Sequence, residues 1–140
     1  MSRRTIAIAA ALSVLALGSP LVTANANPLA NNSFNSGVDK YEQSDYQGAI
    51  ADFTKVIEIY PQNADAYNNR GTAKDVLEDY QGAIADFSKA IEINPEYANA
   101  YVNRGVVRER ASDLEGACRD WRKAVDLGDE RPAEWVKKQC

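Results

Sequence analysis

One segment of the sequence occurs twice, and this repetition constrains the fold more than any other feature. Residues 45–61 and 79–95 are identical at 14 of 17 positions. A second step of the same length relates Ala66–Gly71 to Ala100–Gly105. A fixed period of about 34 residues is typical of proteins that stack copies of one small unit. The sequence therefore predicts three repeats, at about residues 31–63, 64–97 and 98–131.

Each repeat has the pattern of two helices. In the second repeat, Tyr67 and Gly71 are four residues apart, and Ala83 and Phe87 show the same helical spacing. Glycine inside a helix costs about 1 kcal/mol relative to alanine, so Gly71 needs a packing reason. We expect it to face Ala83 and Ala90 across the hairpin. One hairpin cannot bury its own apolar face, so the three hairpins should stack into a solenoid.

The repeat resembles the tetratricopeptide repeat, whose pattern is W-x2-L-G-x2-Y, then A-x3-F, then P. The resemblance covers about residues 31–129 and implies an all-α fold, a right-handed α–α superhelix of three helical hairpins with a C-terminal capping helix. The sequence variants are similar to repeats abundant in cyanobacteria. The glycine slot holds Gly37, Gly71 and Gly105, the alanine slot Ala49, Ala83 and Ala117, the aromatic slot Phe53, Phe87 and Trp121, and the proline slot Pro61 and Pro95.

Charged residues occupy slots of the pattern that are usually apolar. Arg70 and Arg104 stand in the leucine slot, and an aspartate recurs once in each repeat just before the aromatic. We expect these arginines to pair with the aspartates between neighbouring hairpins, and ligand binding by the arginines is the alternative. The aspartates are Asp52, Asp86 and Asp120.

The first helix is the least typical of the pattern. Ser33 replaces the large aromatic, and the apolar residues Phe34, Val38 and Tyr41 are shifted by one position. Either this end of the solenoid is a frayed cap, or these side chains line a surface.

The first 26 residues have the pattern of a secretory signal peptide. Met1–Arg4 is positive, Ile6–Leu17 is uncharged and apolar, and Ala24–Ala26 is a small-x-small triplet. The apolar run of about 12 residues is shorter than the roughly 20 that span a bilayer, which argues against a membrane anchor. We expect residues 1–26 to be removed, 27–30 to form a linker, and 31–140 to form the repeat domain.

Export leaves three compartments open: a periplasm, the outside of the cell or a thylakoid lumen. The precursor has a net charge of −4, and removal of the leader leaves 14 basic and 20 acidic residues, a net charge of −6. This balance lacks the basic footprint of nucleic-acid binding. Because the chain has no histidine, it lacks the commonest general base and metal ligand. We expect neither an enzyme nor a cofactor.

The two cysteines belong to the C-terminal region. Residues 132–140 begin where a fourth repeat would start, and we expect them to form a capping helix with Trp135 in its aromatic slot. With a turn near Asp129, Cys118 and Cys140 lie about 11 residues on either side of it, and thus side by side. In an oxidising compartment we expect a disulfide. The alternative function is a dithiol redox protein that uses this pair.

The resemblance implies protein interaction, because the first helices of such repeats line a concave groove that accepts a partner's peptide or helix. We therefore expect a non-enzymatic, exported interaction module or assembly scaffold. These groove positions are inherited with the repeat, so solvated side chains without a partner are the alternative. An open first helix, with Phe34 and Tyr41, also allows self-association through the N-terminal end. The groove residues carried over by repeat register are Phe34, Val38, Asn68, Asn69, Thr72, Asn99, Val102, Asn103 and Val106.

One subfamily does not fit. The tetratricopeptide domains that clamp the acidic C-terminal tails of heat-shock chaperones use lysines, an arginine and asparagines in this groove. Of those slots only Asn69 matches, and Phe34, Val38, Asn99 and Asn103 occupy the others. We expect no clamp for an acidic tail.

Overall fold

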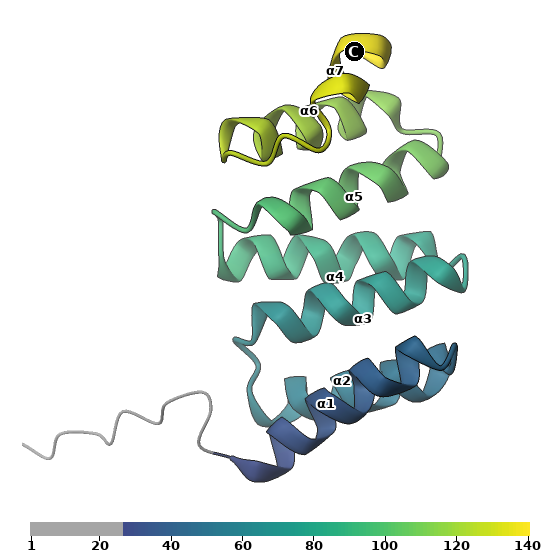
Figure 1. Cartoon of the computed structure of the whole chain (residues 1–140), viewed down its shortest axis with the longest axis vertical. Coiled ribbons are helices and arrows are strands. Elements are labelled where there is room, and N and C mark those ends of the chain that lie inside the picture. Colours follow the sequence, from purple (N-terminus) through teal and green to yellow (C-terminus); the bar gives the residue numbers. More distant parts are fainter. Residues whose placement is uncertain (1–26) are drawn as a thin grey trace, which may run out of the picture.

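The computed structural model describes residues 27–140, which fold into seven α-helices without a β-strand (Figure 1). The expected signal peptide, residues 1–26, lies outside the described residues. None of the helices in the described part is long and apolar enough to span a membrane. The helices are α1 (Pro28–Glu42), α2 (Tyr46–Ile59), α3 (Ala64–Val76), α4 (Tyr80–Ile93), α5 (Ala98–Arg110), α6 (Leu114–Asp126) and α7 (Ala133–Gln139).

Consecutive helices form three hairpins that stack along one axis (Figure 1). The hairpins are α1–α2, α3–α4 and α5–α6, and each second helix also packs against the first helix of the next hairpin. The short helix α7 packs against α6 at the end of the stack. The expected all-α solenoid of three hairpins and a terminal helix is confirmed.

The turn inside each hairpin has one geometry, which the repeated sequence encodes. In the first turn Ser44 has a positive φ of 63°, and Asp45 then caps α2 by accepting a 2.9 Å hydrogen bond from the N–H of Gly48. A Cβ on Gly48 would lie 2.1 Å from Asp45 Oδ2, so a larger residue there would displace the capping carboxylate. A cap of this kind contributes about 1 kcal/mol. The same roles are taken by Glu78, Asp79 and Gly82, and by Ser112, Asp113 and Gly116.

The glycine within the first helix of each hairpin makes room for an aromatic ring. A Cβ on Gly71 would lie 2.9 Å from the Phe87 ring, and one on Gly105 would lie 2.4 Å from Trp121 Nε1. The atoms nearest to this position of Gly71 belong to the Phe87 ring, and not to the alanines that we expected it to face. The rings of the three repeats are fully buried and form the centre of each hairpin's core.

Helix α1 is longer and better packed than its atypical sequence indicates. It begins at Pro28, capped by the side chain of Asn27, so the expected linker at 27–30 is wrong for its last three residues. Ala30 in the first turn is 2% exposed. The ring of Phe34 lies edge-on to Phe53, with 5.6 Å between ring centroids. Of the two alternatives for this end, the structure excludes the frayed cap.

The arginines Arg70 and Arg104 pair with the recurrent aspartate of their own hairpin and not with that of a neighbouring hairpin, which corrects the expected arrangement. Arg70 on α3 forms a two-pronged pair with Asp86 on α4 of the same hairpin, at 2.8 and 2.7 Å. The link to the preceding hairpin comes from the remaining Arg70 nitrogen, which donates to Thr54 Oγ1 at 3.1 Å. The repeat period cannot distinguish the two arrangements, because an aspartate lies on both sides of each arginine. The third hairpin repeats this pattern with Arg104, Asp120 and Ser88.

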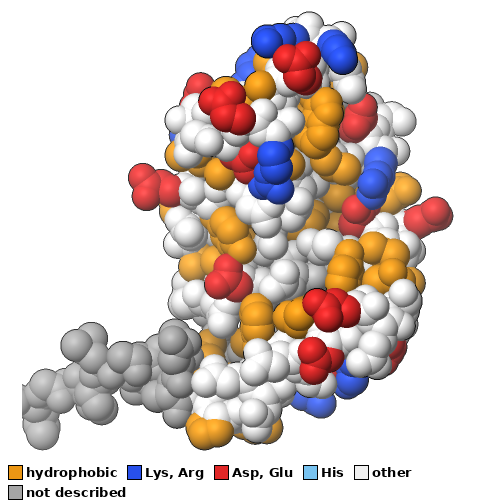
Figure 2. Space-filling view, in the orientation of Figure 1, with side chains coloured by type: hydrophobic (Ala, Val, Ile, Leu, Met, Phe, Trp, Pro, Cys, Tyr) orange, Lys and Arg blue, Asp and Glu red, His pale blue; other side chains and the backbone are white. Residues whose placement is uncertain are grey.

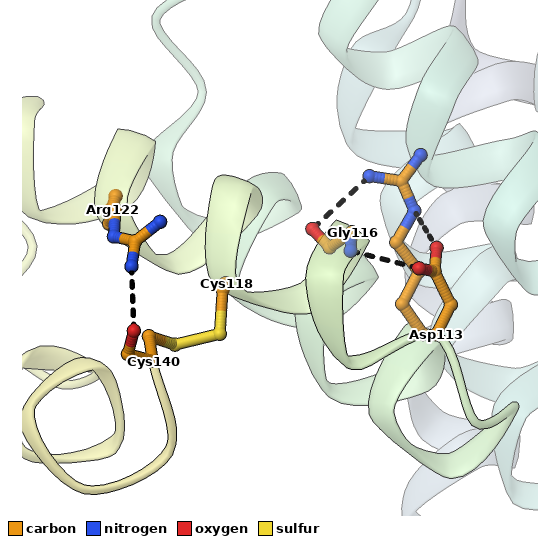
Figure 3. The surroundings of a disulfide bond; sticks show 6 residues. Asp113, Gly116, Cys118, Arg122 and Cys140 are labelled. Atoms are coloured by element: carbon orange, nitrogen blue, oxygen red, sulfur yellow. Dashed lines mark hydrogen bonds and ion pairs between the residues drawn. A yellow bond between two sulfur atoms is a disulfide. The ribbon is translucent and has the colours of Figure 1, made fainter.

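The C-terminal helix α7 is joined to α6 by a disulfide between Cys118 and Cys140 (Figure 3). Cys140 is exposed and its carbonyl oxygen accepts a 3.1 Å hydrogen bond from Arg122 (Figure 3). The Trp135 ring packs against the buried Trp121, with 5.3 Å between centroids. Helix α7 therefore covers the last aromatic ring of the solenoid.

Candidate functional site

The first helices of the hairpins, α1, α3 and α5, share one face of the solenoid, which we call the first-helix face. At the junction of α3 and α5, polar side chains reach from one helix to the other. The Tyr97 hydroxyl donates to Asp65 Oδ1 at 2.6 Å, and Asn103 Nδ2 donates to Asn68 Oδ1 at 3.1 Å. Burial and the bond to Asp65 raise the pKa of Tyr97. These bonds join α3 and α5 across the face.

Two arginines extend this network of bonds. Arg110 on α5 pairs with Asp75 on α3, and this hydrogen bond raises the pKa of Arg110. Beyond α5, Arg131 donates to Asn99 Oδ1 at 2.8 Å and also pairs with Asp129. The polar groups of the α3–α5 junction and of the segment after it therefore bind each other.

The junction of α1 and α3 is different, because its side chains leave two hollows. The positions occupied by Asn68 and Asp75 in α3 hold the aromatic residues Phe34 and Tyr41 in α1, one repeat earlier. The smaller hollow, about 70 Å³, is lined by Val38, Tyr41, Phe53, Asn69 and Thr72. The larger one, about 360 Å³, is lined by Ala30, Asn31, Phe34, Asn35, Val56, Tyr60, Asn63 and Asp65.

Tyr41 lies where the two junctions meet. Burial raises the pKa of its hydroxyl, and the nearby negative charge of Asp75 raises it further. The second carboxylate oxygen of Asp75, Oδ1, is buried without a hydrogen-bond partner. This end of the face thus combines aromatic surface with negative charge.

Four of the nine residues predicted from repeat register border the hollows. Val38, Asn69 and Thr72 line the smaller hollow, and Phe34 lines the larger one. All four are partly buried. The structure therefore brings together four of the five predicted residues of the first two repeats at one junction, and Asn68 is the exception.

The remaining predicted residues are less available to a partner. Asn68 and Val102 are each 4% exposed, so the prediction that they line an open groove is wrong. Asn99 and Asn103 already bond Arg131 and Asn68. Of the five, only Val106 is partly exposed and makes none of these polar bonds. The physical reason is the polar network of the α3–α5 junction, which a repeat pattern does not reveal.

Two residues of the larger hollow lie outside the first helices, and the repeat register did not predict them. Tyr60 and Asn63 belong to the turn between α2 and α3, and both line the larger hollow. A signal was available, since Tyr60 is replaced by Asn94 in the second repeat at an otherwise nearly identical segment. Among residues 27–140 no group of three His, Cys, Asp or Glu residues could hold a metal ion.

Comparison with sequence families identifies the repeat. The tetratricopeptide repeat family matches residues 64–97, and a second TPR repeat family matches residues 37–74. No curated protein matches the sequence. The chain is a tetratricopeptide repeat protein.

Solved structures show the same fold. The TPR domain of Arabidopsis OM64 is 28% identical, with a TM-score of 0.75 over 79% of this chain and 92% of that one. The first TPR domain of human RPAP3 is 27% identical, with a TM-score of 0.74 over 79% and 88%. A structure of the first TPR of Spaghetti (RPAP3) bound to the HSP90 peptide SRMEEVD is also 27% identical, with a TM-score of 0.75 over 78% and 88%. Domains of this fold have been solved in complex with peptides, and this chain is a protein-interaction module.

Proposed function

We propose that the protein is an exported interaction module or assembly scaffold that binds a peptide segment or helix of a partner protein at the α1–α3 junction. The observation that carries this proposal is the pair of hollows beside each other on the first-helix face. Their walls come from α1, α2 and α3, which are fixed by the buried Phe53 beneath them. A partner would therefore meet a largely preformed surface.

The residues around the hollows suit an extended peptide. Asn35 is exposed on α1 and Asn69 is partly exposed on α3. An asparagine amide can donate to a peptide carbonyl and accept from a peptide N–H. Phe34 borders the hollow of Asn35 and Val38 borders that of Asn69, and both offer contact to a partner's apolar side chains. The two asparagines would thus bind the peptide backbone, and Phe34 and Val38 would select among the peptide's side chains.

The peptide-bound RPAP3 domain supports peptide binding by a domain of this fold. The bound peptide SRMEEVD is acidic, and this chain lacks the basic residues that an acidic tail would need at the corresponding positions. We therefore infer peptide binding from the family, and we infer the chemistry of the peptide from the residues of this chain.

Export is part of the proposal, with the disulfide and the leader pattern as its support. A disulfide that holds a terminal helix persists only in an oxidising compartment. Intact-mass measurement of the protein from its native source tests this, since cleavage after Ala26 leaves a chain that starts at Asn27. A full-length mass with free thiols would contradict export.

Site-specific photocross-linking tests the binding site. A photoreactive residue replaces Thr72, which borders the smaller hollow, and the matched control replaces Glu58, which is exposed on α2. We expect the probe at position 72, and not the one at position 58, to form an adduct with a discrete partner in the native exported fraction. Circular dichroism checks that both proteins are folded.

Loss-of-function variants complete the test. The variant Asn69→Ala/Thr72→Trp removes an amide and fills the smaller hollow with the tryptophan side chain. Because position 72 is then occupied, the photoreactive residue replaces Asn35 instead. We expect the adduct formed from position 35 to disappear in this variant. Equal adducts from the groove probe and the α2 probe, or an adduct that survives this double variant, would place the binding site elsewhere.

A further inference from the structure

The positive charges of the first two hairpins are all occupied. Every lysine and arginine between residues 27 and 119 forms an ion pair with an aspartate or glutamate of the chain. The three basic residues of the described chain outside such pairs, Arg122, Lys123 and Lys138, lie on α6 and α7. A partner at the α1–α3 junction therefore meets no free cation there.

Negative charges around the same junction remain available. Asp39 and Glu42 are exposed on the last turns of α1 and form no ion pair within the described chain. Asp65, exposed on α3, accepts the Tyr97 hydroxyl but has no cationic partner among the described residues. Figure 2 shows acidic side chains beside an apolar patch near the right-hand ends of α1 and α3, whereas the basic side chains of that half lie along the bottom edge.

The hollows lie inside this negative field. Asp65 is part of the wall of the larger hollow. Near the smaller hollow Asp75 is already paired with Arg110, so the uncompensated charge at this junction comes from Asp65 and from Asp39 and Glu42 on α1. Opposite charges across an interface speed association and discriminate between partners. An acidic segment would add repulsion and find no arginine or lysine to bind.

We propose that the occupant of the α1–α3 junction is an extended, lysine- or arginine-bearing segment of another protein, which places a small aliphatic side chain in the hollow of Val38, Tyr41, Phe53, Asn69 and Thr72. This inference rests on the proposed function and specifies its partner. The hollow has a volume of about 70 Å³, and the side chains of Val38, Tyr41 and Phe53 make most of its wall apolar. This wall suits an aliphatic side chain, while flanking cations of the segment face Glu42 and Asp65.

A displayed library of random nine-residue peptides tests the charge and the anchor together. The library is selected on the purified full-length protein, with counter-selection on the Asn69→Ala/Thr72→Trp variant to retain peptides that depend on the junction. We expect the retained peptides to be net positive and to share one valine, leucine or isoleucine.

Charge reversal then locates the contact. For an enriched peptide, measured by fluorescence anisotropy, we expect Glu42→Lys to weaken binding by about fivefold or more at low salt, with a smaller effect at high salt because of screening. The matched control Glu58→Lys, an exposed glutamate on α2 that also forms no ion pair within the described chain, changes the net charge equally and should leave the affinity within about twofold. The peptide SRMEEVD should not bind measurably.

The outcomes separate this inference from the proposed function. Junction-dependent peptides that are neutral or acidic would overturn the charge of the partner and leave the binding site intact. If Glu42→Lys and Glu58→Lys weakened peptide binding equally, the effect would come from the net charge of the protein and not from a contact at Glu42. This result would also overturn the inference. No junction-dependent peptide at all would overturn both proposals.

Discussion

The two junctions of the first-helix face use the same repeat and reach different results. At the α3–α5 junction, polar side chains such as Asn103 and Asn68 bond each other and fill the space between the helices. At the α1–α3 junction the equivalent positions hold Asn69 and Phe34, which cannot make that bond, and hollows remain. The comparison teaches that substitutions at a few contact positions decide whether a repeat junction stabilises the solenoid or stays available to a partner.

The largest expected difference concerns the buried aspartate of each end. Asp120→Ala removes the buried carboxylate that Arg104 and Arg108 share, and leaves them with Ser88 and with the longer contact to Asp113. Because these side chains are only 15% and 21% exposed, we expect a loss of about 3 kcal/mol. Asp52→Ala should cost less, about 2 kcal/mol, since Lys40 and Lys55 can reach water. Urea unfolding of both variants measures the difference. A larger loss for Asp52→Ala would contradict the expectation that the more deeply buried ion pairs of Asp120 contribute more to stability.

The disulfide should contribute nearly as much. The bond closes a loop of 22 residues, for which loop-closure entropy predicts about 3 kcal/mol. We expect the variant Cys118→Ser/Cys140→Ser to lose this amount while peptide binding at the α1–α3 junction stays within about twofold. Thermal unfolding with and without reductant measures the loss, and the double variant should be insensitive to reductant. A loss of binding would couple the two ends of the solenoid.

Acid should weaken the N-terminal hairpin through Asp52. Burial would raise the pKa of this carboxyl, but hydrogen bonds from Lys40, Ser36 and Lys55 outweigh burial and lower the pKa to about 2. The unfolded chain, with a pKa of about 4, then binds more protons, so Asp52 stabilises the fold above about pH 4 and loses this effect as the pH falls towards 2. We expect a decrease of about 2 kcal/mol in unfolding free energy across this interval. The variant Asp52→Asn should lack that part of the pH dependence.

The smallest expected effects compare the two asparagines directly. Asn103→Ala leaves Oδ1 of the buried Asn68 without its donor, and we expect a loss of about 1 kcal/mol. Asn69→Ala, at the equivalent position of the preceding repeat, should leave stability within about 0.5 kcal/mol, because its amide borders a hollow. Chemical denaturation resolves these values if the two variants are measured side by side. Equal losses would mean that the α1–α3 junction is as tightly bonded as the other.

The sequence was sufficient for the fold, and four of the residues that it predicted border the hollows of the α1–α3 junction. It revealed neither Tyr60 and Asn63 nor the choice between junctions. The repeat period, with Gly71 and Phe87 at fixed spacing, predicts stacked hairpins because it repeats the pattern of buried positions. It cannot show that Asn68 is buried, since burial depends on Asn103 in the next helix. The same limit applies to Arg70, whose partner could be either neighbouring aspartate until the hairpin geometry selects Asp86.

The bond between Cys118 and Cys140 also gives the solenoid a direction. In a stack where each hairpin contacts only its neighbours, order is lost from whichever end is held least strongly. Within residues 27–140, a disulfide holds the C-terminal end, and the packing of α1 against α2 and α3 holds the other end without a covalent link. Amide protons of α1 and α2 should therefore exchange with solvent first and those of α5 and α6 last. Partner binding at the α1–α3 junction would slow the fastest of these exchange rates.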